Sequence, residues 1–437
     1  MINTYMKTSY SKTMQLIKTL IPYAVARVIP VGLNLIAIPI ILQNSGAETY
    51  GLITVIMSFL AIQVIADLGA INSFLPIFVR KLQDNELDEA KSIFLSTIIR
   101  IFCHGSVFSL LTIPAVIIFF RNANLEVNQE LITDFNFAIC LILFSNVFAG
   151  LAPFTNSILL VYKKNRLSSI LNSGSNSTIA IMLVATSFIE APIIPMTFGI
   201  IFIPMVVSVV TLIWISKKNE LLNFSNIKLN FSYFGFRSQF GNWAIQLSAI
   251  LSVQFDAIIL SLYSDSLEVA RYGVIAKVFL FVVTIYYWTT AQENVEAIKI
   301  ESQGRISEAT SESIRFITRL IVYASIAIIP LTFILKPILS LLTGKMISFN
   351  YLEIFISIIW CLSLLVTTKL SRILYAKGIY KGYFQIGMLV ATINVALTFW
   401  LCSYGLGMIG PLIATICSIF FVYLPCFLYL HRRNSPE

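Results

Sequence analysis

Residues 193–215 read IIPMTFGIIFIPMVVSVVTLIWI, without one charged side chain, and Lys217 and Lys218 follow closely. An α-helix of roughly 20 apolar residues spans the hydrocarbon layer of a bilayer. This stretch therefore predicts a transmembrane helix that ends at a basic membrane surface. The whole chain has the same character, since 57% of its 437 residues are hydrophobic, 12% are charged and the mean hydropathy is +0.85. Soluble domains carry about 25% charged residues, so the composition excludes a soluble protein.

Hydropathy divides the chain into about twelve predicted spans, six in each half. They are Thr19–Leu42, Tyr50–Val79, Ile93–Phe120, Phe135–Val161, Leu167–Phe188, Ile193–Ile215, Phe240–Tyr263, Val269–Ala291, Ile314–Leu342, Tyr351–Tyr375, Tyr383–Tyr404 and Ile409–Leu430. We therefore predict an all-α integral membrane protein of about twelve transmembrane helices. A six-helix bundle is expected at 1–216, a cytoplasmic or interfacial linker at 217–239 and a second six-helix bundle at 240–437.

Lysine and arginine are concentrated in the termini and in alternate loops, which places them on one side of the predicted membrane. The loops of the other side hold only Arg121, Arg271 and Lys345. Basic loops stay in the cytoplasm, so both termini are predicted to be cytoplasmic. The net charge of +9 is thus a signal of topology and not of a nucleic-acid partner.

The two halves share a short motif. Gly46-Ala-Glu-Thr-Tyr-Gly51 opens the second predicted span, and Glu268-Val-Ala-Arg-Tyr-Gly273 opens the eighth. Val161-Tyr-Lys-Lys164 and Leu374-Tyr-Ala-Lys377 form another such pair. With six spans per half, both halves begin on the same side of the membrane. The pattern predicts a parallel duplication about an axis along the membrane normal, as in transporters built from two bundles.

Three features carry a resemblance to a known family. They are the acidic loop that leads into Tyr50-Gly51, the Asp67-Leu-Gly69 sequence, and Gly407-Met-Ile-Gly410-Pro-Leu-Ile-Ala-Thr415. Together with the span pattern, they resemble the polysaccharide transporters, in particular Wzx-type O-antigen flippases, of the multidrug/oligosaccharidyl-lipid/polysaccharide exporter superfamily. The resemblance covers essentially the whole chain.

The resemblance implies a V-shaped pair of six-helix bundles that alternate access around a central cavity in the bacterial inner membrane. The expected substrate is an undecaprenyl-pyrophosphate-linked oligosaccharide, moved from the cytoplasmic to the outer leaflet. H⁺ or Na⁺ is expected as coupling ion, and a polysaccharide polymerase and a chain-length regulator are expected as partners.

Polar side chains inside the predicted spans are the candidate binding residues, because a charge at the bilayer centre costs roughly 2.5–3.5 kcal/mol on insertion scales. We expect the cations to bind the pyrophosphate and the amides to bind sugars in the central cavity. The predicted cavity residues are Arg27, Asn34, Gln63, Arg100, Gln246 and Lys277. For Arg27 and Arg100 the alternative is that they extend to the lipid headgroups.

Asp67, Asp256 and His104 are the candidates for proton or ion coupling. The alternatives are a helix-end role for Asp67, an ion pair for Asp256 and a hydrogen-bonded core position for His104. No catalytic residue, metal or cofactor is predicted. His104 and His431 are the only histidines, and Gly344-Lys345-Met346 lacks the pattern of a phosphate-binding loop. We therefore predict secondary or passive transport, not an enzyme.

Two other functions stay open. A cation-coupled multidrug exporter of the same superfamily predicts an acid-dominated cavity, whereas the spans of this chain hold more basic than acidic groups. A membrane-embedded glycan polymerase or glycosyltransferase needs a large external loop or paired carboxylates. The predicted external loops are short, and Asp265 with Glu268 is better explained as a turn and helix start.

Overall fold

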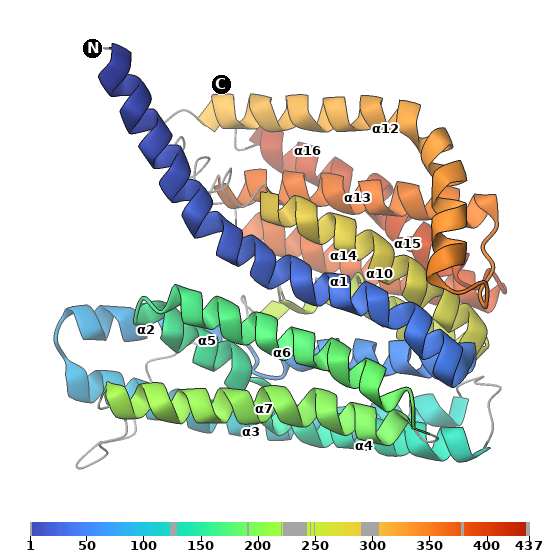
Figure 1. Ribbon diagram of the computed structural model, residues 1–437, viewed down its shortest axis with the longest axis horizontal. Coiled ribbons are helices and arrows are strands. Elements are labelled where there is room, and N and C mark those ends of the chain that lie inside the picture. The colour runs from blue at the N-terminus through green and yellow to red at the C-terminus, as the bar shows by residue number, and fades with distance from the viewer. Residues whose placement is uncertain are drawn as a thin grey trace.

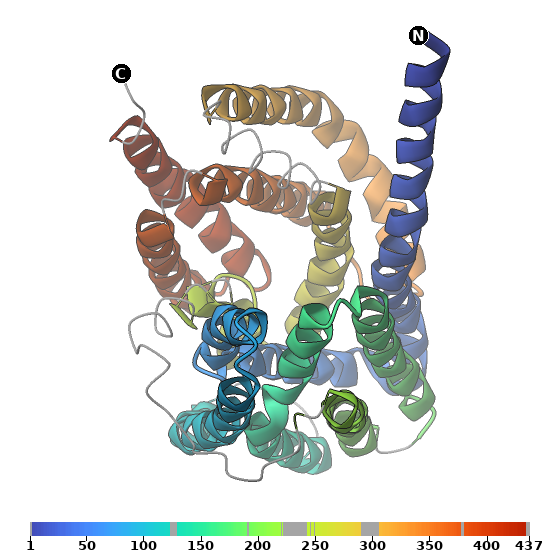
Figure 2. The same ribbon diagram turned by 90° about the vertical axis from the view of Figure 1, so that its left-hand side faces the viewer.

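The computed structural model describes residues 2–122, 129–189, 192–219, 221, 243–244, 246–248, 250–289, 306–376 and 380–433, with side chains along the first helix from Val28 onward. Every regular element within these ranges is a helix. Figure 1 shows long helices, most of them side by side, with the blue-to-green first half below and the yellow-to-red second half above, except that the dark-blue first helix begins at the upper left and crosses downward. Figure 2 looks along the helices and shows the same two groups, with the beginning of the first helix lying beside the second group.

The first bundle contains seven α-helices and one short 3-10 helix. They are α1 Ile2–Ile62, η1 Gln63–Ile65, α2 Ala70–Gln83, α3 Leu87–Asn122, α4 Gln129–Ala149, α5 Leu151–Val161, α6 Asn165–Thr186 and α7 Ile193–Lys218. Two predicted spans are joined within α1, where the chain kinks at Gly46 with φ 83° and ψ 168°. Only glycine adopts this conformation at little cost. The kink therefore replaces a loop between the first two predicted spans.

The second predicted span is itself broken. After η1, Leu68 and Gly69 have positive φ values of 50° and 76°, and α2 begins at the next residue. A non-glycine residue in the left-handed region is uncommon. The break thus needs support from neighbouring groups, which the site description below identifies.

The second bundle contains α9 Phe255–Tyr263, α10 Ser266–Thr289, α12 Ile306–Leu342, α13 Tyr351–Ala376, α14 Tyr380–Ser403, α15 Ile409–Ser418, η3 Ile419–Tyr423 and α16 Leu424–Arg433. The π-helical η3 connects α15 to α16 within the last predicted span. The predicted linker at 217–239 and the start of the seventh predicted span fall largely outside the described residues.

Nine helices in the described part of the chain are long and apolar enough to cross a membrane. This number is below twelve because α1 combines the first two predicted spans, α6 opens with a polar run, and the seventh predicted span is only partly described, with α9 as its 9-residue helix. Large apolar side chains also face outward, with Leu110 69%, Phe144 67% and Ile326 71% exposed. Such a surface suits hydrocarbon and not water. The chain is a multi-pass membrane protein, and the count of twelve stays a prediction.

The packed core lies in three clusters of buried apolar side chains. The largest draws on both bundles and includes Ile53 and Ile56 of α1 with Val274 and Ile275 of α10. A second cluster belongs to the first bundle, where the Phe154 ring lies 5.0 Å from that of Phe74. The third lies within the second bundle. The bundles therefore meet through α1 and α10.

Candidate functional site

The bundles touch most closely where the two copies of the repeated motif meet. Gly51 of α1 packs against the backbone of Ser266, and Gly273 of α10 packs against the side chain of Thr54. A methyl group on either glycine would collide with these neighbours. Small residues let membrane helices approach this closely. We call this contact the glycine seam.

Lys277 lies beside the glycine seam, about one turn after Gly273 on α10. Its Nζ is 4.8 Å from the centre of the Tyr50 ring, which is a cation–π distance. Tyr50 is fully buried, and its hydroxyl has no hydrogen-bond partner among the described residues. The ion pairs found in the described part of the chain do not include Lys277. Among the described residues, the interface thus presents a cation whose charge is stabilised by an aromatic face and by no acidic group.

Asp256 lies in the second bundle with none of its surface exposed. One carboxylate oxygen accepts a hydrogen bond from the Thr398 hydroxyl at 3.2 Å. The other accepts from Tyr272 at 3.3 Å and Thr415 at 3.4 Å. These hydroxyls come from α14, α10 and α15. Within the described residues this carboxylate has no ion pair, and a buried charge of this kind needs a proton or a cation.

Carboxylate and hydroxyl oxygens are the ligands that hard cations take. Asn394, one turn before Thr398 on α14, adds an amide that donates to the Ser252 carbonyl at 3.1 Å. The described residues contain no cluster of three or more histidine, cysteine or acidic side chains that could hold a metal ion. A buried carboxylate with hydroxyl neighbours has the chemistry that binding of a proton or a monovalent cation would require.

Asp67 has a different environment. Its two carboxylate oxygens accept hydrogen bonds from the backbone N–H groups of Gly69 at 3.0 Å and Ile71 at 3.1 Å. These groups belong to the start of α2, where the first N–H groups of a helix lack partners. His104 Nδ1 lies 2.9 Å from the Asp67 carbonyl and donates to it, because a carbonyl only accepts. The structure thus brings Asp67 and His104 together, and both support the break at Leu68-Gly69.

Of the predicted cavity residues, Gln63 and Asn34 bind to the first bundle itself. Gln63 Nε2 donates to the Ile142 carbonyl at 3.1 Å and to the Ser145 hydroxyl at 2.5 Å. Asn34 Nδ2 donates to the Pro30 carbonyl at 2.9 Å. Both side chains are partly buried. These contacts therefore fix the orientation of the amides and leave part of each side chain exposed.

The other predicted cavity residues are less closely grouped. Arg100 is half-buried on α3, and the side chain of Arg27 lies outside the described residues. Gln246 has a buried Oε1 without a hydrogen-bond partner in the described part of the chain. It follows Trp243, whose indole N–H donates across the interface to the Ile65 carbonyl at 3.0 Å. The sequence did not predict this link to the break in the second span.

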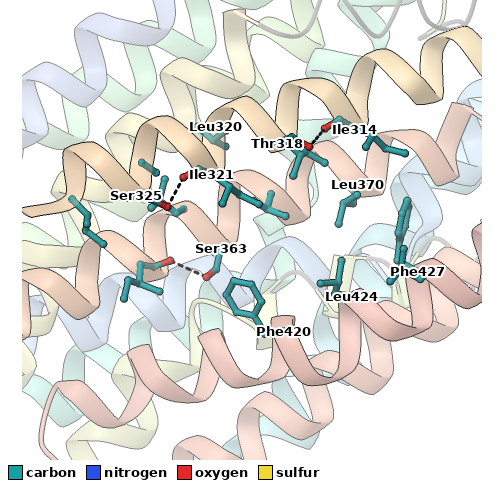
Figure 3. A pocket seen from close by; sticks show the side chains of 17 residues that line it. Ile314, Thr318, Leu320, Ile321, Ser325, Ser363, Leu370, Phe420, Leu424 and Phe427 are labelled. Atoms are coloured by element: carbon teal, nitrogen blue, oxygen red, sulfur yellow. Dashed lines mark hydrogen bonds between the residues drawn. The ribbon is translucent and has the colours of Figure 1, made fainter.

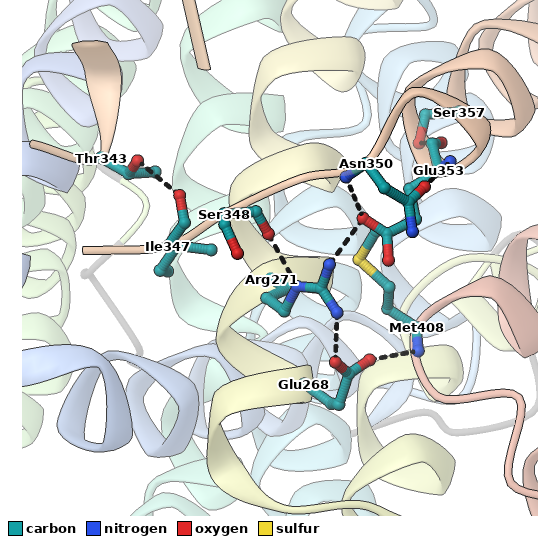
Figure 4. Close-up of polar contacts among 9 residues, drawn as sticks. All are labelled: Glu268, Arg271, Thr343, Ile347, Ser348, Asn350, Glu353, Ser357 and Met408. Atoms are coloured by element: carbon teal, nitrogen blue, oxygen red, sulfur yellow. Dashed lines mark hydrogen bonds and ion pairs between the residues drawn. The ribbon is translucent and has the colours of Figure 1, made fainter. Parts of the chain in front are cut away.

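Sequence reasoning also missed a polar network at the start of α10, next to the glycine seam (Figure 4). The Arg271 guanidinium pairs with Glu268 and, at 2.5 Å, with Glu353. Glu268 also accepts the Met408 N–H at 2.9 Å. Asn350 and Glu353 exchange side chain-to-backbone hydrogen bonds at 2.8 Å in each direction. This capping box can be recognised in the sequence Asn350-Tyr-Leu-Glu353, but its connection to Arg271 cannot.

No protein-family model matches the chain, and no curated protein matches it by sequence. Solved structures do match. An inward-facing multidrug resistance MATE family transporter of the MOP superfamily aligns with a TM-score of 0.70 and 12% identity, covering 94% of this chain and 98% of the other. The lipid II flippase MurJ in an inward closed conformation aligns with a TM-score of 0.66 and 17% identity, covering 94% and 87%.

A MOP superfamily transporter from Pyrococcus furiosus aligns with a TM-score of 0.53 and 12% identity, covering 95% of each chain. MOP is the multidrug/oligosaccharidyl-lipid/polysaccharide exporter superfamily. These identities are low, so the likenesses establish the fold alone. The chain has the helical fold that these transporters share over nearly its full length.

Proposed function

We propose that the chain is a flippase that moves an undecaprenyl-pyrophosphate-linked oligosaccharide from the cytoplasmic to the outer leaflet by alternating access. The observation that carries the proposal is Lys277, a cation at the interface of the bundles with an aromatic neighbour in Tyr50 and no acidic partner in the described residues. A pyrophosphate is a dense anion that needs such a group at bilayer depth. The resemblance of the sequence to polysaccharide transporters supports the same substrate class.

The glycine seam gives this function a gate. The seam is a close contact between α1 and α10, and alternating access requires these two helices to part and close again. Lys277 lies directly beside it on α10, so the cation becomes accessible from either side as the seam changes. The predicted amides Asn34, Gln63 and Gln246 supply hydrogen bonds for sugars, and Arg27 and Arg100 supply further positive charge.

Asp256 is the proposed coupling site. Binding of H⁺ or Na⁺ neutralises its carboxylate, and Tyr272 connects the site directly to α10 and thus to the glycine seam. Asp67 and His104 are the weaker candidates, because their contacts stabilise a break in the backbone. Polymerase and chain-length regulator partners belong to this proposal through the sequence resemblance only.

Replacement of Lys277 tests the proposal. The readout is translocation of a fluorescent undecaprenyl-pyrophosphate disaccharide in proteoliposomes, followed with a membrane-impermeant quencher. Loss of one charge-assisted contact lowers the rate roughly 10- to 100-fold, so Lys277→Ala should fall in this range while Lys277→Arg retains more activity. Lys336→Ala is the matched control, because Lys336 Nζ lies 3.9 Å from the Tyr351 ring centre in a similar contact within the second bundle, between α12 and the start of α13. Wild-type rates from Lys277→Ala would contradict the proposal.

A cation-coupled multidrug exporter is the second candidate. The observation in its favour is Asp256, a buried acid without a cationic partner among the described residues. This function predicts ethidium efflux that depends on Asp256 and tolerates Lys277→Ala. The flippase predicts lipid translocation that depends on both residues, with no ethidium efflux.

A further inference from the structure

A narrow apolar crevice runs between the two bundles, separate from the glycine seam. Its volume is about 550 Å³, which lies within the usual range for ligand pockets. The first bundle contributes residues of α1, α3 and α4, such as Phe59, Phe119 and Asn146. The second contributes Trp243, Leu247, residues of α9 such as Phe255 and Leu262, and Phe399 of α14. We call it the inter-bundle crevice.

The wall of the inter-bundle crevice suits a hydrocarbon chain. Aromatic and aliphatic side chains form most of the wall, including the Phe59 and Phe119 rings at 5.7 Å. Because both bundles line this crevice, its shape changes when the bundles move relative to each other. The shape of a groove within one bundle does not depend on that movement.

A second groove of similar size provides the contrast (Figure 3). It has a volume of about 520 Å³ and lies entirely within the second bundle, between α12, α13 and the η3–α16 segment. Its hydroxyls are all satisfied, because Thr318, Ser325 and Ser363 donate to carbonyls of their own helices. The lining residues of that groove therefore present no unpaired hydroxyl to a ligand, and the acyl chains of the bilayer are sufficient to cover it.

The inter-bundle crevice differs in one buried polar group. Asn146 is 3% exposed and lines the crevice, and its Oδ1 has no hydrogen-bond donor among the described residues. Gly105 fits against the Asn146 backbone, which holds α3 and α4 close together. A buried amide oxygen is costly without a donor. A ligand in the crevice should therefore carry a hydroxyl or N–H group beside its apolar part.

We propose that the inter-bundle crevice holds part of the hydrocarbon tail of the transported glycolipid, with a hydroxyl of the first sugar, which follows the pyrophosphate, donating to Asn146 Oδ1. The inference rests on the proposed function and extends it by naming a binding site for the lipid tail of the substrate. The tail stays in an apolar wall formed by both bundles while the phosphate is bound near Lys277.

Photo-crosslinking tests the placement. The full-length protein in phosphatidylethanolamine–phosphatidylglycerol nanodiscs is irradiated with an undecaprenyl-linked disaccharide that carries a diazirine on its tail, and labelled peptides are identified by mass spectrometry. Labels should map to residues 142–146 and 255–262, and unlabelled glycolipid should compete while excess phospholipid does not. Labelling confined to the groove of α12, α13 and α16, or equal competition by phospholipid, would overturn the proposal.

Two variants sharpen the result. Leu247→Trp fills the inter-bundle crevice and should lower labelling at least about fivefold, whereas the matched Leu424→Trp, which fills the groove of Figure 3, should leave it unchanged. Asn146→Leu keeps the apolar wall and removes the amide. It should abolish the preference for the disaccharide-linked lipid over undecaprenyl phosphate. An unchanged preference would refute the role of Asn146.

The outcome for the tail site is separable from that for the flippase. Translocation that requires Lys277 but is unaffected by Leu247→Trp would overturn the tail site and leave the proposed function intact. Competed labelling of the crevice in a chain that moves no lipid would refute the flippase, and it would show the crevice as a glycolipid-binding site.

Discussion

Asp67 and Asp256 are the two carboxylates that the sequence placed inside spans as candidates for ion coupling, and the structure gives them opposite surroundings. Asp67 accepts hydrogen bonds from two backbone N–H groups. Asp256 accepts from three side-chain hydroxyls on three different helices. A backbone N–H can only donate a hydrogen bond, so it favours the ionised form of the carboxylate that accepts it. A hydroxyl also has lone pairs and can turn them toward a cation. Coupling thus depends on the kind of donor as much as on the carboxylate.

Asp256→Asn should give the largest effect. The amide keeps the size of the side chain but cannot exchange a proton or neutralise a bound cation. We expect gradient-driven lipid translocation to fall about 100-fold or more, since a lost interaction with a buried charge costs about 3 kcal/mol or more. Thermal stability should be unchanged or higher, because a buried charge disappears. Translocation in proteoliposomes under imposed H⁺ or Na⁺ gradients measures the effect, and full gradient dependence in this variant would remove Asp256 from the mechanism.

Asp67→Ala should affect the fold more than the transport step. The substitution leaves the N–H groups of Gly69 and Ile71 without their acceptors, which costs about 1–2 kcal/mol of unfolding free energy. Asp67→Asn retains one acceptor oxygen and should lose about half as much. Unfolding in detergent measures stability, and ion dependence is then compared at equal amounts of folded protein. A stable variant that has lost ion dependence would reverse the assignment of the two carboxylates.

Gly273→Ala tests whether the Asp256 site and the glycine seam act together. The added methyl collides with Thr54, so α10 must shift, and Tyr272 shifts with it. We expect a cysteine introduced at the glycine seam to change its accessibility to a thiol reagent. We also expect the affinity for the coupling ion to weaken several-fold. Gly105→Ala is the informative control, because that methyl also collides, but within the first bundle between α3 and α4. Equal loss of ion affinity in both variants would show general destabilisation instead of coupling through α10.

The sequence predicted much of the architecture but little of the difference between the surroundings of Asp67 and those of Asp256. Hydropathy predicted the helices, and the Tyr-Gly repeats that indicated duplication lie where the bundles meet. The surroundings of Asp256 depend on Tyr272, Thr398 and Thr415, which packing brings together from distant parts of the chain. No local pattern encodes that meeting. The helix-end alternative for Asp67 was accessible because its partners, Gly69 and Ile71, are local in sequence.

Tyr272→Phe should give the smallest effect. It is the most specific test of the three hydroxyl groups that surround Asp256. It removes one donor to Asp256 at 3.3 Å and leaves the aromatic packing of α10 in place. One neutral hydrogen bond is worth about 0.5–1.5 kcal/mol, so ion affinity should weaken roughly 2- to 12-fold. Tyr286→Phe serves as control, since its ring packs on Phe316 toward the far end of the same helix. If Tyr272→Phe tightens ion binding, the hydroxyl competes with the cation for the carboxylate, and the lone pairs of Thr398 and Thr415 must suffice as ligands.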